Sequence, residues 1–212
     1  TRITYEGASI ADVQLDHFTS GAGGTALVGG TGQWVLKVDN DQIGDRRVNQ
    51  GPEQNSALNN AWTVAKKPYF RAEFSLSVND SRTRVFLGFR TTLAGAGVNE
   101  AVPAVPGAEM HGGLLWNGTS WLVSTGDGAT SSTGTLTTSP TVAARNVVEV
   151  YVTSGVSVEI WLNGVLVATK TTSVPGSGTM EWQELLDVPA GGGAADDSFL
   201  TLGEVILQEE VP

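Results

Sequence analysis

The feature that most constrains the fold is an alternation of apolar and polar residues over Asn146 to Lys170, NVVEVYVTSGVSVEIWLNGVLVATK. Apolar residues occupy every second position in two successive runs, Val148 to Val152 and Val156 to Leu162. Side chains of a strand point alternately to opposite faces, so a period of two predicts strands with one buried face. Asn163-Gly164 precedes a third apolar run, and this pair favours the positive φ angles of a type I′ turn. The segment is therefore predicted to be an antiparallel meander.

Composition extends this interpretation to the whole chain. The 212 residues include 27 glycines, and segments of helical period are nearly missing, as expected for many short strands joined by turns. All-β sandwiches often reach this size as one domain. We therefore predict a single domain over residues 1–212, built as a two-sheet antiparallel β-sandwich of about a dozen strands. Residues 1–10 are interpreted as an extended arm, and residues 91–112, interrupted by Pro103 and Pro106, as a long surface loop.

Other strand candidates follow from the same alternation. The strongest is Tyr69 to Val78, and Arg82 to Arg90 returns after a turn. A hairpin is predicted across Asn117-Gly118. The remaining candidates are residues 11–18, 25–28, 33–39, 61–65, 113–116, 121–125 and 199–208.

One short helix is predicted at Thr179 to Asp187, TMEWQELLD. Its acidic residues Glu181, Glu184 and Asp187 recur at a spacing of three, which would place them on one solvated side of a helix.

Charge and cysteine content restrict the partners. Twelve Lys and Arg against 22 Asp and Glu give a formal net charge of −10, which repels phosphate backbones and predicts no nucleic-acid partner. The chain has no Cys, so disulfides and thiolate metal sites are excluded. The N-terminal TRITYEGASI lacks the basic and apolar regions of a signal peptide, and no run approaches the roughly 18 apolar residues that span a bilayer. We therefore expect a soluble chain with no membrane partner.

The order of the segments resembles the concanavalin A-like jelly roll, especially its laminin G-like branch. The resemblance covers roughly Pro68 to Gln208 and is carried by PYFRAEFSLSV, TRVFLGFR, GGLLWNGTSWLVSTGDG, the meander described above and SFLTLGEVILQ. It implies that the last strand returns beside the first. Members of this superfamily include lectins, carbohydrate-binding modules, glycoside hydrolases, polysaccharide lyases and structural proteins of bacterial virus heads and tails, so the resemblance implies a fold more directly than a function.

The motifs of catalytic members are missing from the sequence. Hydrolases of this fold usually carry carboxylates close together on one strand as E-x-D-x-E, and its lyases carry Gln-x-His and Tyr-rich strands. Neither pattern has a counterpart here. His17 is interpreted as a residue at a strand rim and His111 as a surface residue. We therefore predict that the protein is not an enzyme, and we rank an inactive-looking relative of a glycan hydrolase below the other hypotheses.

Calcium is the one cofactor for which the sequence offers candidates. DNDQIGD, starting at Asp39, imitates the opening of a calcium loop, but isoleucine stands at its fifth position and Gln50 where a bidentate glutamate belongs. An ordinary Asx turn is the alternative. The resemblance adds a second candidate in STGDG, since related domains often hold calcium at a loop rim. The calcium candidates are Asp39, Asp41, Asp45 and Asp127.

Aromatic residues supply the candidate contact site. Carbohydrate sites stack exposed rings on sugar faces, and Trp is also enriched at protein interfaces; the alternative is that these rings belong to the core. Trp116 and Trp121 flank the Asn117-Gly118 turn, and Trp161 lies on the polar face of the meander. The candidate contact residues for a carbohydrate or a partner protein are Trp161, Trp121, Trp116, Tyr151 and Asn117.

Two functions remain open. The leading interpretation is a non-enzymatic virion structural protein, either a capsid decoration protein or another accessory protein at the virion surface. It would assemble in the host cytoplasm and contact capsid or other virion proteins. A homo-oligomer is expected, because outward Trp161, Tyr151 and Tyr69 would otherwise expose apolar area. The alternative is a carbohydrate-binding, lectin-like module for glycan attachment.

Overall fold

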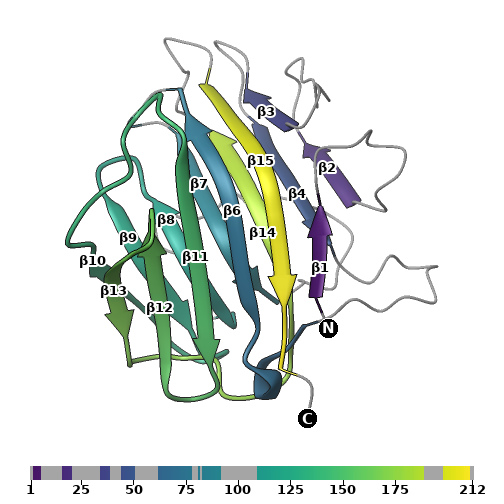
Figure 1. The fold of residues 1–212 in the computed structure, drawn as a ribbon, viewed down its shortest axis with the longest axis vertical. Helices are drawn as coiled ribbons and strands as arrows, with labels where there is room; N and C mark the ends of the chain where they lie inside the picture. Colours follow the sequence, from purple (N-terminus) through teal and green to yellow (C-terminus); the bar gives the residue numbers. More distant parts are fainter. Residues whose placement is uncertain are drawn as a thin grey trace.

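The protein consists of two stacked antiparallel sheets, as Figure 1 shows for the computed structural model. The structure describes residues 2–5, 16–20, 34–38, 44–50, 62–77, 81, 83–91, 109–188 and 198–210. These residues form strands β1 to β15 and a single 3₁₀ turn at Val64–Lys66. The predicted all-β sandwich is therefore confirmed. Within the same ranges, no helix is long and apolar enough to cross a membrane.

The first sheet has seven strands in the order β1-β15-β6-β11-β12-β13, and β3 pairs with β15 as well. Arg2 in β1 is the register partner of Gln208 in β15, so the last strand lies beside the first, as the resemblance implied. The strands are β1 (Arg2–Tyr5), β3 (Trp34–Val38), β6 (Tyr69–Leu76), β11 (Asn146–Thr153), β12 (Ser157–Leu162), β13 (Val165–Lys170) and β15 (Ser198–Gln208).

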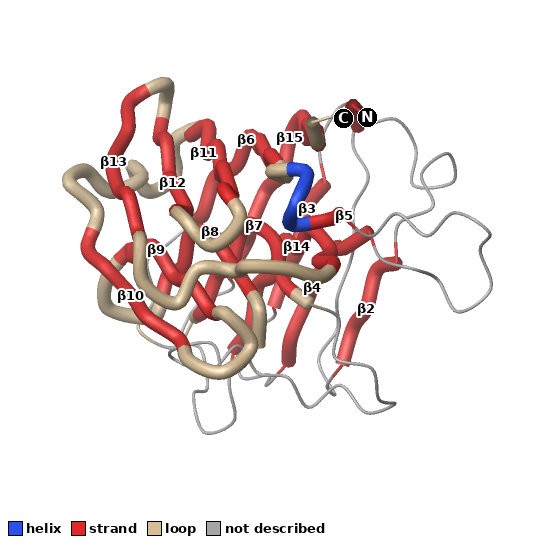
Figure 2. The backbone as a smooth tube through the Cα atoms, turned by 90° about the horizontal axis from the view of Figure 1, so that it is seen from below, coloured by secondary structure: helices blue, strands red, loops and turns tan. Residues whose placement is uncertain are grey.

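The second sheet has eight strands in the order β10-β9-β8-β7-β14-β4-β2, and β5 pairs with the start of β14. Figure 2 shows the two sheets as separate layers when the molecule is seen from below. The strands are β2 (Asp16–Ser20), β4 (Gly44–Gln50), β5 (Trp62–Thr63), β7 (Arg84–Arg90), β8 (His111–Trp116), β9 (Trp121–Gly126), β10 (Ser131–Thr135) and β14 (Thr179–Val188).

The predicted meander is confirmed as β11, β12 and β13. Asn163 and Gly164 both have positive φ angles, 52° and 80°, as a type I′ turn requires. The buried row begins later than the alternation suggested, because Val156 lies in the turn before β12 and is exposed. Val165 is also 60% exposed, since a bulge in β12–β13 pairing at Ile160 shifts the register of the edge strand.

The core fills the space between the sheets with aromatic and branched side chains. Phe70 of β6 contacts two rings of the opposite sheet, Phe89 with ring centroids 6.2 Å apart and Trp182 at 6.3 Å. All three side chains are fully buried. Aromatic pairs at such distances add to the stabilisation that comes from burying their apolar area. The sandwich therefore depends on contacts between β6, β7 and β14.

The predicted helix at Thr179 to Asp187 is wrong, because this segment is strand β14. It lies in the middle of the eight-stranded sheet, where Leu186 pairs with Val85 of β7 and with Arg46 of β4. Backbone pairing on both edges outweighs the helical preference of Glu, Leu and Met. The acidic side chains Glu181 and Glu184 are consequently buried, and they do not form the solvated face that a helix would have presented.

The remaining segments match the sequence prediction to different degrees. Strands β1 and β4 were not anticipated, and β10 lies in a Ser, Thr and Gly segment that lacked alternation. Strand β1 belongs to the segment interpreted as an extended arm. The strand candidate at residues 25–28 and most of the expected long loop, residues 92–108, lie outside the described residues.

Candidate functional site

The outer face of the seven-stranded sheet presents two parallel rows of side chains. Register pairing across β15, β6, β11 and β12 aligns these side chains strand by strand. With neighbouring strands about 4.8 Å apart, each four-residue row spans about 14 Å. The first row consists of Gln208, Tyr69, Tyr151 and Glu159, and the second of Ile206, Arg71, Glu149 and Trp161.

Three aromatic rings from these rows contact one another. The centroids of Tyr69 and Tyr151 lie 4.6 Å apart, and those of Tyr151 and Trp161 lie 6.4 Å apart in an edge-on arrangement. Tyr151 is 39% exposed, while Tyr69 and Trp161 are half-buried. The sequence placed Tyr151 and Trp161 on this outward face, and the structure brings them together through their strands β11 and β12. The rings form a continuous aromatic surface across three strands.

Two carboxylates hold these rings in place. Glu149 Oε2 accepts hydrogen bonds from the hydroxyls of Tyr69 and Tyr151, both at 3.0 Å. The indole N–H of Trp161 donates to Glu159 Oε2 at 3.3 Å. Burial, and then the hydrogen bond to Glu149, raises the pKa of both tyrosines, so each hydroxyl stays protonated and remains a donor. The rings are therefore oriented by a fixed set of hydrogen bonds.

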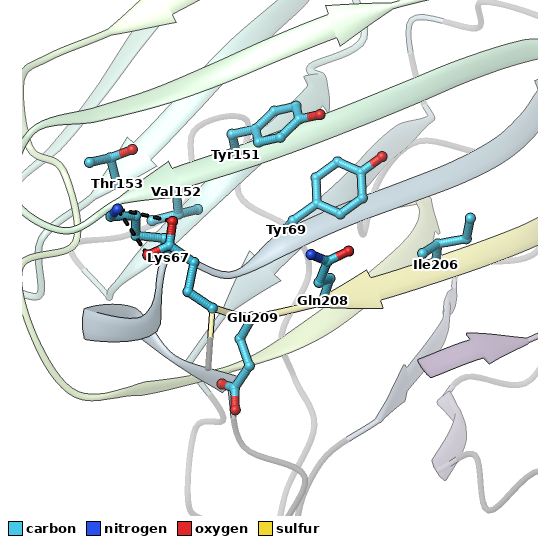
Figure 3. A pocket seen from close by; sticks show the side chains of 9 residues that line it. Lys67, Tyr69, Tyr151, Val152, Thr153, Ile206, Gln208 and Glu209 are labelled. Carbon is cyan, nitrogen blue, oxygen red and sulfur yellow. Dashed lines mark hydrogen bonds and ion pairs between the residues drawn. The ribbon is translucent and has the colours of Figure 1, made fainter. Parts of the chain in front are cut away.

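A hollow of about 560 Å³ opens beside the two tyrosines, at the end of β6, β11 and β15 (Figure 3). Figure 3 shows the Tyr69 and Tyr151 rings side by side, with Gln208 next to Tyr69 and Lys67 near Thr153. Lys67 forms an ion pair with Glu210 at 2.9 Å. The hollow continues the aromatic surface into a concave region whose walls are partly polar and partly apolar.

Trp116 and Trp121, which the sequence suggested as contact residues, lie in the core instead. They are 5% and 4% exposed, and their ring centroids are 5.6 Å apart inside the sandwich. Their strands β8 and β9 pair so that Trp116 and Trp121 face each other on the inner side. Asn117 shapes the turn between them, because its Oδ1 accepts from the backbone N–H of Thr119 and Ser120. None of these three residues belongs to the aromatic surface.

The structure describes two of the four calcium candidates, Asp127 and Asp45, and they lie at different strands of the eight-stranded sheet. Asp127 caps the turn between β9 and β10: its carboxylate accepts from the backbone N–H groups of Thr130 and Ala129, which lowers the pKa of the Asp127 carboxyl. Asp45 lies in β4, opposite Asp187 in the register, whereas Asp39 and Asp41 lie outside the described residues. The described residues contain no group of three or more potential metal-ligating side chains. Calcium binding stays a prediction.

A second polar cluster, which the sequence did not reveal, lies on the outer face of the eight-stranded sheet. Here His111 is fully buried, so its interpretation as a surface residue was wrong. Its Nδ1 donates to the carbonyl oxygen of Glu109 at 2.8 Å, and its Nε2 lies 2.9 Å from Ser124 Oγ. Arg90 is paired with the Glu109 carboxylate at 2.5 Å. Only the β7–β8–β9 register brings these residues together, which explains why their sequence positions gave no signal.

Replacing His111 with glutamine should reduce the sensitivity of the protein to acid. Burial lowers the pKa of His111 to about 4, below its ordinary 6.5, so the neutral ring stabilises the fold above pH 6.5 and this contribution is lost as the pH falls towards 4. Between pH 7 and pH 4, the native protein should therefore lose up to about 3 kcal/mol more of its free energy of unfolding than His111→Gln does. Urea unfolding at both pH values measures this difference. Equal losses for the two proteins would contradict the assignment of a neutral, buried ring.

Comparisons with known proteins place the fold in a class. No protein-family model matches the chain, and no curated protein matches it by sequence. Solved structures do match. The carbohydrate recognition domain of Emp47p is 11% identical, with 91% of this chain and 89% of that one covered and a TM-score of 0.60. A β-glucanase from Bacillus licheniformis is also 11% identical, with 99% and 98% covered and a TM-score of 0.64.

An endo-β-1,4-glucuronan lyase from the fungus Trichoderma reesei is a third similar structure. It is 12% identical, with 100% of this chain and 96% of that chain covered and a TM-score of 0.63. Such identities show the fold alone. The chain is thus a concanavalin-like jelly-roll β-sandwich, a fold that it shares with a lectin-type domain and with enzymes that act on glycans.

Proposed function

We propose that this protein is a carbohydrate-binding module and that the outer face of the seven-stranded sheet contacts the glycan. The observation that carries the proposal is the aromatic surface of Tyr69, Tyr151 and Trp161, three touching rings on an open sheet face. Aromatic rings offer large apolar contact area at a low entropic cost, and their polar atoms here are already bonded to Glu149 and Glu159.

The surroundings of the rings suit a polyhydroxylated ligand. Ring faces can stack on the apolar faces of a sugar, while carboxylate oxygens accept hydrogen bonds from its hydroxyl groups. Gln208 adds an amide that both donates and accepts. The adjoining hollow of about 560 Å³ falls within the range of roughly 300–1,000 Å³ that is usual for small-molecule sites. A short oligosaccharide could therefore lie across the rings and end in the hollow.

The structural neighbours support a role with carbohydrates at the level of fold. They include a domain whose name states carbohydrate recognition and enzymes whose names state action on glucan and glucuronan. The sequence lacks the E-x-D-x-E motif of hydrolases with this fold, so we propose binding without turnover. The virion decoration role has no support among these neighbours and stays a prediction from sequence, as do the homo-oligomer and the location at the virion surface.

Removing the two rings that the meander contributes, Tyr151 and Trp161, tests this proposal. We expect the native protein to bind a subset of a glycan array, and Tyr151→Ala and Trp161→Ala each to weaken that binding at least tenfold, because truncated aromatic hot spots cost about 2 kcal/mol or more. Titration calorimetry with the best glycan gives the magnitude.

Val142→Ala provides the matched control, because Val142 is also 39% exposed but lies in the turn before β11. Its glycan affinity should be unchanged. A folded native protein that binds no glycan, or binding that survives both aromatic substitutions, would refute the proposed function.

A further inference from the structure

From the charges around the rings, we infer that the preferred glycan carries free amino groups, as in an oligomer of glucosamine, and that acidic glycans are rejected. This inference rests on the proposed function and adds the ligand class. It depends on which charges on the face are already neutralised, on where the others lie relative to the rings, and on what an ammonium group would meet there.

The cations described on and beside this face are all engaged in ion pairs. Lys66 pairs with Glu209 at 3.0 Å and Lys67 with Glu210 at 2.9 Å. Arg71 pairs with Glu204 at 2.5 Å, and Arg145 pairs with Glu73. Among the residues whose side chains the structure describes, this face therefore has no unpaired cation to receive the carboxylate or sulfate of an acidic sugar.

Two carboxylates form no ion pair with a described side chain, and they are the two that hold the rings; Arg71, the register partner of Glu149, is paired with Glu204 instead. Glu149 and Glu159 each use Oε2 for ring donors, two tyrosine hydroxyls in one case and the Trp161 indole in the other. No described residue bonds to the Oε1 atom of either one. Each carboxylate therefore has one oxygen beside the aromatic surface to which no described residue bonds.

An ammonium group placed over the rings would interact favourably with the rings themselves and with the carboxylates of Glu149 and Glu159. The faces of Tyr and Trp attract cations through their quadrupoles, and Trp is the strongest of these rings. Glu149 and Glu159 would accept charge-assisted hydrogen bonds, which are roughly twice as strong as neutral ones. The formal net charge of −10 favours approach of a cationic polymer and opposes approach of an acidic one. An acetylated or purely hydroxylated sugar would keep the stacking but lose the charge contribution.

The test compares four oligosaccharides of equal length, built from glucosamine, N-acetylglucosamine, glucose or glucuronate. Titration calorimetry at about pH 5.5, where amines are protonated and ordinary glutamates are ionised, measures each affinity at low and at high salt. We expect the glucosamine oligomer to bind about tenfold more tightly than the acetylated and neutral ones at low salt, with this advantage shrinking as salt increases. The glucuronate oligomer should bind most weakly.

The double variant Glu149→Gln/Glu159→Gln should lose the preference for glucosamine, so that its affinities for the amino and neutral oligomers become similar; glutamine can still accept from the ring donors. Asp127→Asn is the control. It also removes a negative charge, but from the turn between β9 and β10 of the other sheet, and the asparagine can still cap that turn. This variant should keep the preference for glucosamine. Equal binding of the amino and neutral oligomers, tighter binding of glucuronate, or a preference that survives the double variant would overturn the inference and leave the proposed function standing. A native protein that binds none of the four would instead count against both.

Discussion

Replacing Trp182 with alanine is expected to lower the free energy of unfolding by about 3–5 kcal/mol, the largest effect of any substitution we consider. Trp182 is fully buried in β14, and its ring stacks on Phe70 of the opposite sheet at 6.3 Å. β14 pairs with β7 on one edge and β4 on the other, so its backbone is held and cannot collapse into the space that the indole leaves. Urea denaturation followed by circular dichroism gives the free energy directly.

Trp161→Ala is the control for this measurement, because it removes the same side chain from the half-buried outer face. Trp161→Ala should lower the free energy of unfolding much less than Trp182→Ala does, since less apolar surface returns to water and no closed cavity forms. Similar losses for the two variants would contradict the placement of the Trp182 side chain in the core between the sheets. They would also weaken the distinction between core tryptophans and the aromatic surface.

The same strand shows why sequence alone misjudged this region. Met180, Trp182 and Leu186 follow the period of two that marks a strand, but Glu184 occupies the third of the four inward positions and interrupts it. The spacing of the acidic residues then suggested a helix, and the local preferences of Glu, Met and Leu agreed with that assignment. Only pairing with β7 and β4, which come from distant parts of the chain, decides in favour of a strand. Local signals could not report that partnership.

The meander and the aromatic surface illustrate the opposite case. Strands β11 and β12 each have one buried and one open face, so alternation correctly assigned Tyr151 and Trp161 to the outside. The β8–β9 hairpin has apolar residues on both faces, with Leu115 packed against Phe86 on its outer side. Alternation therefore disappears in HGGLLW, and the inward direction of Trp116 could not be read from it. Contacts such as Glu149 with Tyr69 depend on register between strands that are distant in sequence.

Replacing Glu184 with leucine is expected to stabilise the protein by about 1–3 kcal/mol at neutral pH, the cost of burying a polar group without a partner. Glu184 is fully buried, and neither carboxylate oxygen has a hydrogen-bond partner among the described residues. Its neighbours on the same face of β14 are Trp182 and Leu186, both members of the core. Leucine supplies apolar contacts of similar extent and leaves no polar atom to desolvate.

The stability gained by Glu184→Leu should depend on pH, because burial raises the pKa of the Glu184 carboxyl. Burial raises the pKa of the Glu184 carboxyl well above its ordinary 4.5, so the folded protein retains this proton after the unfolded chain has lost its own. The contribution of Glu184 to stability is fully present below about pH 4.5 and is lost as the pH rises through the folded pKa. The advantage of Glu184→Leu over the native protein should therefore be larger at pH 8 than at pH 5, as unfolding experiments at the two values would show.

Glu184→Gln separates the charge from the polarity of this group. Glutamine cannot ionise, so the variant should lose the pH-dependent part of the cost while keeping a buried amide that lacks a partner. Its stability should therefore lie between those of the native protein and Glu184→Leu at pH 8, and close to the native value at pH 5. If the difference between Glu184→Gln and the native protein does not change with pH, the carboxyl is already ionised or solvated in the folded state. In that case the tolerance of β14 for an acid in its inward row would have to come from access to water rather than from a retained proton.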